Sequence, residues 1–287
     1  MLTAVVVHRR RPEACVATGR ALLEQGVDRL IVVDNGSDAE QVAHVRAGLP
    51  AADVVELGFN AGFGPGANAG FRRWLDDGHG EWVLLAPHDA APEPDCVQKL
   101  VKAAAARPRA GLACAEYGDD GFGGKTLPVV DRYLGGVLER RSADGNGWEA
   151  CGHPHGTLML ARRACLEEIG LFDERYFAYC EEADLGLRAA AAGWEVGIVW
   201  GAVVRNPGMG SEVGVPEYLM LRNNLLLIRE HSGRWPATFY FGLAIWLTVR
   251  GALGGRKTLF WHLPGRVYAM RDFLRGRYGP PPPELLH

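Results

Sequence analysis

Short runs of β-branched and aliphatic residues alternate with longer segments of helical spacing through the first 115 residues. The runs predicted to be strands span 3–8, 29–33, 54–57, 82–85 and 111–115. Between these runs apolar residues recur every three or four positions, which predicts amphipathic helices. The predicted helices span 12–25, 39–49, 64–75 and 94–106. Strands that alternate with helices indicate an α/β fold, an open and mostly parallel sheet flanked by helices.

Polar side chains follow three of these predicted strands at the point where each strand ends. They are His8 and Arg9 after the first strand, Asp34 and Asn35 after the second, and His88 and Asp89 after the fourth. Ligands of open α/β sheets bind outside the carboxyl ends of the strands. We therefore expect a binding site at this edge of the sheet.

The alternation weakens between about 117 and 155 and then returns. Regular patterns follow at 156–161, 164–169, 181–192 and 196–200. From Pro216 onward the pattern is helical until four consecutive prolines at 280–283. These shifts predict a domain over 1–215, with halves at 1–115 and 116–215, followed by a helical C-terminal extension over 216–287.

The composition is that of a soluble globular protein. The chain has 31 Lys and Arg against 34 Asp and Glu, a formal net charge of −3, and 48% hydrophobic residues. This balance excludes a disordered chain, a collagen-like chain and a strongly basic nucleic-acid-binding protein. The extension, 216–287, holds ten basic and four acidic residues, which leaves 21 and 30 in 1–215. The extension therefore carries +6 and the rest of the chain −9.

The extension also holds 11 of the 26 aromatic residues. Helices of this composition pack on the catalytic domain or on a second subunit, which is the interpretation we prefer. Basic charge beside Trp and Tyr is also typical of a helix that contacts an anionic membrane surface, and this second interpretation stays open.

The six cysteines are widely spread and form no C-x-x-C pair, which argues against a zinc site and a redox dithiol. Free thiols in a reducing compartment are the better interpretation. The longest apolar stretch, Phe239–Val249, is far shorter than the ~20 residues that span a bilayer. At the N-terminus the apolar run precedes the positive charges, the reverse of a signal peptide. We expect a cytoplasmic protein that does not cross a membrane.

A glycine-rich segment, NAGFGPGANAG at 60–70, precedes one of the predicted helices. Small residues let backbone N–H groups approach a diphosphate, and the helix N-terminus then favours its negative charge. A tight packing turn would have a similar composition. The segment differs from the dinucleotide-binding fingerprint in its glycine spacing and in its position after the third strand.

Carboxylates at two further places in the chain are candidate site residues. Asp89 follows a hydrophobic strand, where it can hold a divalent metal beside a diphosphate, although a turn or capping role would explain a lone aspartate equally well. Glu181, Glu182 and Asp184 lie at the start of a predicted helix, where acids complement the helix dipole. Two neighbouring acids also raise a pKa toward that of a useful general base.

Several motifs occur in a fixed order along the chain. They are VDNGS at 33–37, NAGFG at 60–64, Asp89 with PEPD at 92–95, Gly156 with Arg162 and Arg163, GLFDE at 170–174, and EEADL at 181–185 with Arg188. This set resembles the family 2 glycosyltransferases, in particular their rhamnosyltransferase- and galactofuranosyltransferase-like branch, over about residues 3–230. The resemblance implies a GT-A fold, a nucleotide-diphospho-sugar donor and inversion at the anomeric carbon.

The resemblance also implies a role for individual residues, with donor binding in the half 1–115 and acceptor binding and catalysis in 116–215. Asp34 is expected to contact the nucleobase or ribose. The other expected donor-site residues are His8, Arg9, Asn35, Asn60, Gly62, Phe63, Gly64, Asn68, His88 and Asp89. Glu182 stands where the family commonly has an aspartate general base, with Glu181 and Asp184 beside it.

The metal site departs from the family pattern. Only the last carboxylate of the family's metal-binding triplet is present, at Asp89, because Pro87 and His88 fill the first two positions. The stretch 203–211 lacks the histidine that often coordinates the metal. Two hypotheses follow: Asp89 holds Mg²⁺ or Mn²⁺, or Arg205 or Arg222 neutralises the leaving diphosphate as a fixed cation.

The predicted acceptor-binding residues are His153, His155, Gly156 and Thr157, although loop packing explains the two histidines equally well. The predicted function is an inverting glycosyltransferase that moves a sugar to a hydroxyl of a glycan, a lipid-linked sugar or a secondary metabolite. Alternatives are a catalytically degenerate sugar-nucleotide-binding protein or transferase partner, and a nucleotidyltransferase on the same fold. No nucleic-acid partner is expected.

Overall fold

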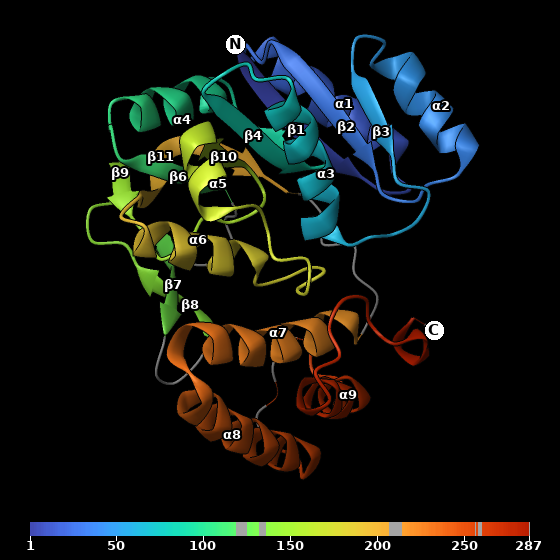
Figure 1. Cartoon of the computed structure of the whole chain (residues 1–287), viewed down its shortest axis with the longest axis vertical. Coiled ribbons are helices and arrows are strands. Elements are labelled where there is room, and N and C mark those ends of the chain that lie inside the picture. Colours follow the sequence, from blue (N-terminus) through green and yellow to red (C-terminus); the bar gives the residue numbers. More distant parts are fainter. Residues whose placement is uncertain (119–124, 132–135, 207–213, 256, 258–259, 287) are drawn as a thin grey trace.

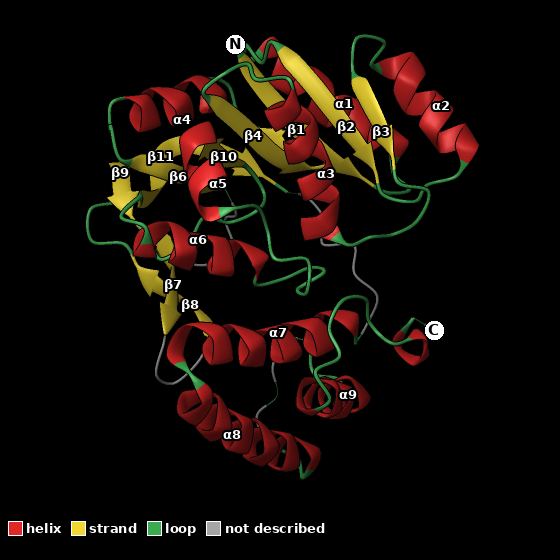
Figure 2. Cartoon of the chain, viewed as in Figure 1, coloured by secondary structure: helices red, strands yellow, loops and turns green. Residues whose placement is uncertain are grey.

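The computed structural model describes residues 1–287 except 119–124, 132–135, 207–213, 256, 258–259 and 287. A mixed sheet covered by helices occupies the upper part of Figure 1, and a further group of helices lies below it. Figure 2 shows the strands and helices by colour. The strands are β1 (Leu2–His8), β2 (Arg29–Asp34), β3 (Asp53–Glu56), β4 (Trp82–Pro87), β5 (Ala91–Pro92), β6 (Ala110–Tyr117), β7 (Thr126–Asp131), β8 (Gly136–Arg141), β9 (Gly147–Ala150), β10 (Met159–Arg162) and β11 (Glu195–Arg205). The helices are α1 (Pro12–Glu24), α2 (Ala39–Gly48), α3 (Phe63–Asp76), α4 (Cys96–Ala105), α5 (Arg163–Ile169), α6 (Glu181–Ala191), α7 (Val215–Ser232), α8 (Arg234–Ala252), α9 (Leu263–Leu274) and the short 3₁₀ helix η1 (Pro283–Leu285).

Among the described residues the main sheet has nine strands, in the order β3-β2-β1-β4-β10-β6-β11-β5, with β9 paired to β11. Strands β1 to β4 run parallel, as the alternation predicted. In this register His8 lies beside Asp34, and Val7 lies between Val33 and Pro87. The polar residues that follow three predicted strands therefore meet at one edge of the sheet, as expected.

The second half of the sheet is not purely parallel. Strand β10 runs antiparallel to both β4 and β6. The chain leaves β6 and re-enters at β10 at the same edge, without a crossover helix, so β10 must run in the opposite direction. Strands β7, β8 and β9 fall in the stretch of weak pattern. Five of the six residues of β8 are exposed, so it lacks the apolar run that marks a buried strand.

Two apolar cores lie on opposite faces of the sheet. Along β1, Ala4 and Val6 belong to one core, and Val5 and Val7 belong to the other. Helices α1, α2 and α4 cover the first face, and α3, α5 and α6 cover the second. Burial on both faces explains why the central strands are continuous apolar runs rather than alternating ones.

The helical extension is confirmed, and it begins with α7. This helix packs on α6 through Leu226 and Leu227. Helices α8 and α9 pack on α7 through a separate core that includes Tyr218, Ala244 and Ala269 (Figure 1). The division of the chain into domains at 215/216 remains a prediction. In the described part of the chain, no helix has the length and apolar character needed to cross a bilayer.

Candidate active site

A cleft with a volume of about 1150 Å³ lies at the edge of the sheet where β1 and β4 end. The strand-end wall of the cleft consists of Arg9, Arg10, Arg11, Asn60, Gly62, Phe63, Pro87, His88 and Asp89. The helix wall consists of residues 137–139 and 177–183 together with Val215, Leu219, Met220, Asn224, Pro280, Pro281 and Leu286. The sequence-predicted site residues that line the cleft are Arg9, Asn60, Gly62, Phe63, His88, Asp89, His153, His155, Gly156, Thr157, Glu181 and Glu182. The fold thus brings most of the predicted residues to one cavity.

His8 and Asp34 form a buried pair beside the strand-end wall. Nδ1 of His8 donates to Oδ1 of Asp34 at 3.1 Å, and its Nε2 accepts from the backbone N–H of Arg11 at 3.3 Å. The other carboxylate oxygen of Asp34 accepts from the backbone of Ser37 at 3.1 Å. Burial lowers the pKa of His8 although the charge of Asp34 raises it, which favours a neutral ring. The pair fixes the turns after β1 and β2, and neither side chain is part of the cleft lining.

Asn35 holds the glycine-rich loop against the sheet. Its buried side chain donates to the carbonyl of Gly62 at 2.9 Å and accepts from the N–H of Ala61 at 2.8 Å. Gly62 has a φ of 99°, and a Cβ there would lie 2.3 Å from the carbonyl oxygen of Phe177. The N–H of Gly64 donates to that same oxygen at 3.3 Å. A side chain at Gly62 would therefore break the contact between this loop and the segment before α6.

Asp89 ends the strand-end wall and is half-buried. Its Oδ1 accepts from Nδ2 of Asn206 at 3.2 Å, and Nη1 of Arg11 lies 3.9 Å from its Oδ2. The neighbouring His88 packs edge-on against His8, with ring centroids 6.0 Å apart. Burial lowers the pKa of His88, which favours a neutral ring. The charged groups at this end of the cleft are thus one carboxylate and the arginines that follow β1.

Glu181 and Glu182 begin α6 in the helix wall. The Glu182 carboxylate lies against Gly156, where a Cβ would come within 2.2 Å of its Oε1. Burial raises the pKa of the Glu182 carboxyl, although His155 and a backbone hydrogen bond at Gly156 oppose this. Glu181 is 1% exposed, and no described residue donates a hydrogen bond to its Oε2. Burial, together with the charge of Glu182, raises the pKa of Glu181 well above its ordinary range.

A tight turn before α6 sets the position of the two glutamates. Three of its residues have left-handed backbones, with φ of 67°, 68° and 73° at Phe177, Tyr179 and Cys180. The buried amide of Asn223 in α7 donates to three carbonyls of this segment, at 2.9, 2.8 and 2.7 Å to Tyr176, Ala178 and Tyr179. Strained backbones of this kind persist only where surrounding contacts hold them. Helix α7 therefore supports the turn that presents the acidic pair.

Comparison with known proteins identifies the family. The sequence profile described as Glycosyl transferase family 2 matches residues 3–170. The chain belongs to this family. N-acetylglucosaminyl-diphospho-decaprenol L-rhamnosyltransferase of Mycobacterium tuberculosis is 28% identical over 268 residues, covering 80% of this chain and 84% of the relative. Low-salt glycan biosynthesis hexosyltransferase Agl10 of Haloferax volcanii is 25% identical over 177 residues, covering 60% and 56%.

The predicted membership of family 2 and of its rhamnosyltransferase-like branch is thus confirmed, and the chain is a glycosyltransferase. Solved structures confirm the GT-A fold. The mannosyltransferase PcManGT from Pyrobaculum calidifontis, in complex with GDP-Man and Mn²⁺, has a TM-score of 0.58 at 17% identity, covering 96% of this chain and 85% of that chain. GalNAc-T7 with UDP, GalNAc and Mn²⁺ has a TM-score of 0.64 at 11% identity, covering 96% and 56%.

Two predicted site residues of the transferase, Asn68 and Asp184, form hydrogen bonds within the fold and do not line the cleft. The side chain of Asn68 is buried; it accepts from the N–H of Phe172 at 3.0 Å and donates to its carbonyl at 2.9 Å. Asp184 accepts from Arg188 at 2.8 Å and pairs with His231 at 2.7 Å. Burial raises the pKa of Asp184, but the His231 hydrogen bond and the Arg188 charge outweigh it and lower the pKa. Asp184 thus links α6 to α7.

The two arginines predicted to neutralise the diphosphate also lie outside the cleft lining. Nε of Arg205 donates to Glu93 at 2.8 Å, at the edge of the sheet. Arg222 is fully buried; it donates to the hydroxyl of Tyr218 at 3.0 Å and to the carbonyl of Gly279 at 2.8 Å. The structure therefore gives Arg222 a role in joining α7 to the C-terminal segment.

Both predicted acceptor-site histidines line the cleft, and each donates a hydrogen bond to a backbone carbonyl. Nδ1 of His153 donates to the carbonyl of Pro154 at 2.8 Å, and burial lowers its pKa. Nε2 of His155 donates to the carbonyl of Ala115 at 2.6 Å, and its ring packs edge-on against Tyr117. These contacts give both histidines a role in loop packing, and both rings also line the cleft.

The structure also adds cleft residues that the sequence did not indicate. Arg10, Arg11 and Asn206 join the strand-end side. Apolar residues of the helix wall are Val137, Leu138, Phe177, Val215, Leu219, Met220, Pro280, Pro281 and Leu286. The charge run after the first strand was visible in the sequence. No local pattern, in contrast, shows that a β-hairpin, α7 and the C-terminal segment face one cavity.

Asp89 has the carboxylate chemistry that Mg²⁺ and Mn²⁺ prefer in a ligand. The described residues contain no cluster of three or more His, Cys, Asp and Glu placed to bind an ion. In the stretch without the expected histidine, Pro207 to Ser211 lie outside the described residues. Mg²⁺ in phosphate-transfer sites commonly takes one or two carboxylates, with phosphate oxygens and water as the other ligands. Asp89 beside a donor diphosphate matches that pattern.

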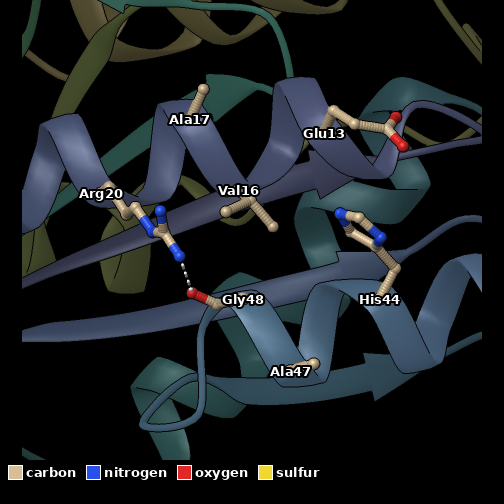
Figure 3. A pocket seen from close by; sticks show the side chains of 7 residues that line it. All are labelled: Glu13, Val16, Ala17, Arg20, His44, Ala47 and Gly48. Atoms are coloured by element: carbon tan, nitrogen blue, oxygen red, sulfur yellow. Dashed lines mark hydrogen bonds between the residues drawn. The ribbon is translucent and has the colours of Figure 1, made fainter.

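A second, smaller hollow of about 470 Å³ lies between α1 and α2. Its lining is Glu13, Val16, Ala17, Arg20, His44, Ala47 and Gly48 (Figure 3). Arg20 donates to the carbonyl of Gly48 across it at 3.2 Å. None of the predicted site residues line this hollow, so we assign no function to it.

Proposed function

We propose that this transferase moves a sugar from a nucleoside-diphospho-sugar to a hydroxyl of a lipid-linked glycan, with inversion at the anomeric carbon. The observation that carries the proposal is that Glu182 lines the same cleft as Asp89 and the arginines at 9–11. A single displacement needs a base on the acceptor side and positive charge on the leaving-group side. The helix wall offers the first, and the strand-end wall offers the second.

On the donor side, Arg9, Arg10 and Arg11 would bind the diphosphate, because guanidinium groups pair well with phosphate oxygens. Mg²⁺ or Mn²⁺, when bound, would be held by Asp89 and would supply positive charge to the leaving diphosphate. The turn held by Asp34 would receive the nucleoside. Loss of activity in excess chelator would support metal dependence, and full activity would exclude a required metal at Asp89.

On the acceptor side, Glu182 would take the proton of the acceptor hydroxyl as its oxygen attacks the anomeric carbon. The bond from that carbon to the diphosphate oxygen breaks, and the nucleoside diphosphate leaves on the opposite face. The raised pKa of the Glu182 carboxyl moves it toward the range of an effective base. Glu181, whose raised pKa favours its neutral form, would donate a hydrogen bond from its buried carboxyl to a sugar hydroxyl.

The acceptor proposal rests on the apolar part of the helix wall, which includes Leu138, Leu219 and Leu286. A glycan on a polyprenyl carrier offers a hydroxyl for Glu182 and hydrocarbon for this wall. The mycobacterial relative bears a name that specifies a decaprenol-linked acceptor and rhamnose transfer. Rhamnose donors and decaprenol-type acceptors are therefore the first substrates to assay.

The substitution Glu182→Gln tests the mechanism. Because an amide cannot accept the proton, we expect turnover to fall by about 10²–10⁴-fold with donor binding retained. Release of nucleoside diphosphate measures turnover, and calorimetry measures donor binding. Glu195→Gln is the control, since Glu195 pairs with Arg107 at 3.3 Å outside the cleft lining and should keep the normal rate. Near-normal turnover in Glu182→Gln would remove Glu182 from the role of base.

The cellular setting is part of the same proposal. All six cysteines are free thiols in the structure, and five of them are buried. Free thiols suit a reducing compartment, so we infer that the transferase works in the cytoplasm. Within the chain, we infer that 1–215 forms the catalytic domain and 216–287 an extension that completes the helix wall.

A further inference from the structure

Helix α8 exposes several large apolar side chains, although Tyr240 and Phe241 pack inward on the core of the extension. The five most exposed are Trp235, Phe239, Trp246, Val249 and Leu253, with exposed fractions of 85%, 60%, 54%, 53% and 83%, and Ile245 and Leu247 are exposed at 45% and 37%. The buried residues are Ala237, Ala244, Thr248 and Gly251. A helix that serves only to pack on its neighbours would show the opposite distribution.

These five residues share one face, which we call the α8 stripe (Trp235, Phe239, Trp246, Val249 and Leu253, the last directly after the helix). Their spacing of four, seven, three and four residues places them within an arc of about 80° on a helix of 3.6 residues per turn. The stripe therefore runs the full length of α8 along a single face. Exposed apolar surfaces of this extent mark interaction sites in soluble proteins.

Helix α9, in the same extension, also exposes apolar side chains. Leu263, Val267 and Leu274, spaced by four and seven residues, have exposed fractions of 41%, 50% and 70%. Both helices pack inward on α7 through one shared core. Helices α8 and α9 lie on the side of α7 away from the sheet (Figure 1). Apolar side chains are thus exposed on two helices of this part of the extension.

The charge around the α8 stripe identifies its partner. No acidic residue occurs between Glu230 and Asp272. Of the described basic residues in this segment, Arg266 is buried against Glu217 and Arg271 pairs with Asp272, whereas Arg234, Arg250 and Lys257 are exposed. The guanidinium of Arg250 lies 5.3 Å from the ring centroid of Trp246, at one edge of the stripe. Helical spacing puts Arg234 at the other edge. Basic residues thus flank an apolar surface rich in Trp.

A second copy of the chain fits this surface poorly. In a symmetric pair the α8 helices would face each other, and α8 contains two arginines and no acid. Every charged contact between the two helices would then be repulsive. An anionic bilayer supplies the missing negative charge, and its headgroup region also accommodates Trp and aliphatic side chains.

We propose that the α8 stripe docks on the headgroup region of an anionic phospholipid membrane, with α8 lying in the plane of the surface. Arg234 and Arg250 contact lipid phosphates, and the stripe enters the boundary with the acyl chains. This placement goes beyond the proposed function but suits it, because cleft residues Met220 and Leu286 are exposed on the same extension. A lipid-linked acceptor would reach the cleft without leaving the membrane.

Sedimentation of the full chain with vesicles tests the proposal. We expect the protein to pellet with vesicles of phosphatidylcholine containing about one third phosphatidylglycerol, and to bind more weakly to phosphatidylcholine alone or at high salt. The double substitution Trp235→Glu and Trp246→Glu should weaken binding by about 10- to 100-fold. Arg250→Glu should weaken binding to the anionic vesicles only. The vesicles contain no glycan and no donor is added, so the result is independent of the proposed reaction.

Leu23→Glu is the matched control, because Leu23 is a 39% exposed leucine on α1, away from the extension. It should pellet with the anionic vesicles as the unaltered chain does, and circular dichroism should show all variants folded. Three results would overturn the proposal: no pelleting of the unaltered chain at low salt, unchanged pelleting of the double variant, or a dimer in light scattering that the double variant converts to a monomer. The last result would assign the stripe to a second copy.

Discussion

The strand-end wall and the helix wall of the cleft are built in different ways. The strand-end wall follows from the sheet itself, since His8 and Asp34 are register neighbours and Asn35 ties down the adjoining loop. The helix wall depends on a later part of the chain, because Asn223 in α7 holds the turn that precedes the acidic pair. The proposed donor side of the cleft is thus built by the sheet, whereas the position of Glu182 depends on the extension.

The strongest test of this difference is Asn223→Ala. It removes the side-chain donor to the carbonyls of Ala178 and Tyr179 and one of the donors to the carbonyl of Tyr176, which keeps Arg222, so we expect a loss of about 2–3 kcal/mol in the free energy of unfolding. Because the turn positions Glu182, turnover should fall about 100-fold while the KM for the donor changes little. Denaturant unfolding and steady-state kinetics measure the two effects.

Thr238→Ala is the control for Asn223→Ala, since the Thr238 hydroxyl bonds only within α8, to the carbonyl of Arg234 at 2.9 Å. It should change the free energy of unfolding by less than about 0.5 kcal/mol. If Asn223→Ala kept full turnover in its folded state, α7 would have no part in placing the glutamate.

The second prediction concerns the pH dependence of stability at Glu181. Burial and the charge of Glu182 hold the pKa of this carboxyl well above its ordinary value of 4.5 in the folded chain. Below pH 4.5 both folded and unfolded chains hold the proton. As pH rises from there, the unfolded chain loses its proton first, so the native state loses stability until the pH passes the folded pKa.

Glu181→Gln removes this titration. Its free energy of unfolding should exceed that of the unaltered chain by an amount that grows by up to about 1.4 kcal/mol per pH unit within this window. Urea titrations at several pH values measure the difference. A constant difference between the two proteins across the window would mean that the folded pKa of Glu181 is ordinary.

The third prediction has the smallest expected effect and concerns the strand-end wall. Asn35→Ala removes the two hydrogen bonds to Ala61 and Gly62, and should cost about 1–2 kcal/mol in the free energy of unfolding. We expect the KM for the donor to rise with kcat nearly unchanged, the opposite of Asn223→Ala. Arg20→Ala, in the second hollow, is the control and should alter neither constant. An equal fall in kcat for both Asn variants would show that the two walls are not separate.

Much of the fold could be predicted because its signals are local. The strands of the parallel half are continuous apolar runs, and the helices between them keep a regular apolar spacing, so short windows of sequence were sufficient. Strand β8 escaped prediction because nearly all of its residues are exposed. At β10 the sequence showed only a regular pattern over 156–161, and the antiparallel direction of this strand depends on where the chain re-enters the sheet.

The same distinction between local signals and long-range contacts applies to the residues of the cleft. Motif positions indicated Asp89 and Glu182, and both line the cavity. Arg222 and Asp184 also occur in motif-like positions, but their side chains form hydrogen bonds within the fold. Residue type and spacing cannot distinguish a guanidinium that faces a ligand from one that faces a buried carbonyl, because a guanidinium donates the same hydrogen bonds to either.

Local sequence was therefore enough to establish the alternating sheet, the polar strand ends, the acidic pair and the basic, aromatic character of the extension. These features depend on residues only a few positions apart. Three-dimensional packing alone established that α7 supports the turn at 177–180, that the C-terminal segment completes the cleft, and that α8 exposes Trp235 and Trp246. Each of these depends on contacts between segments far apart in the chain, whose relative placement no short window of sequence contains.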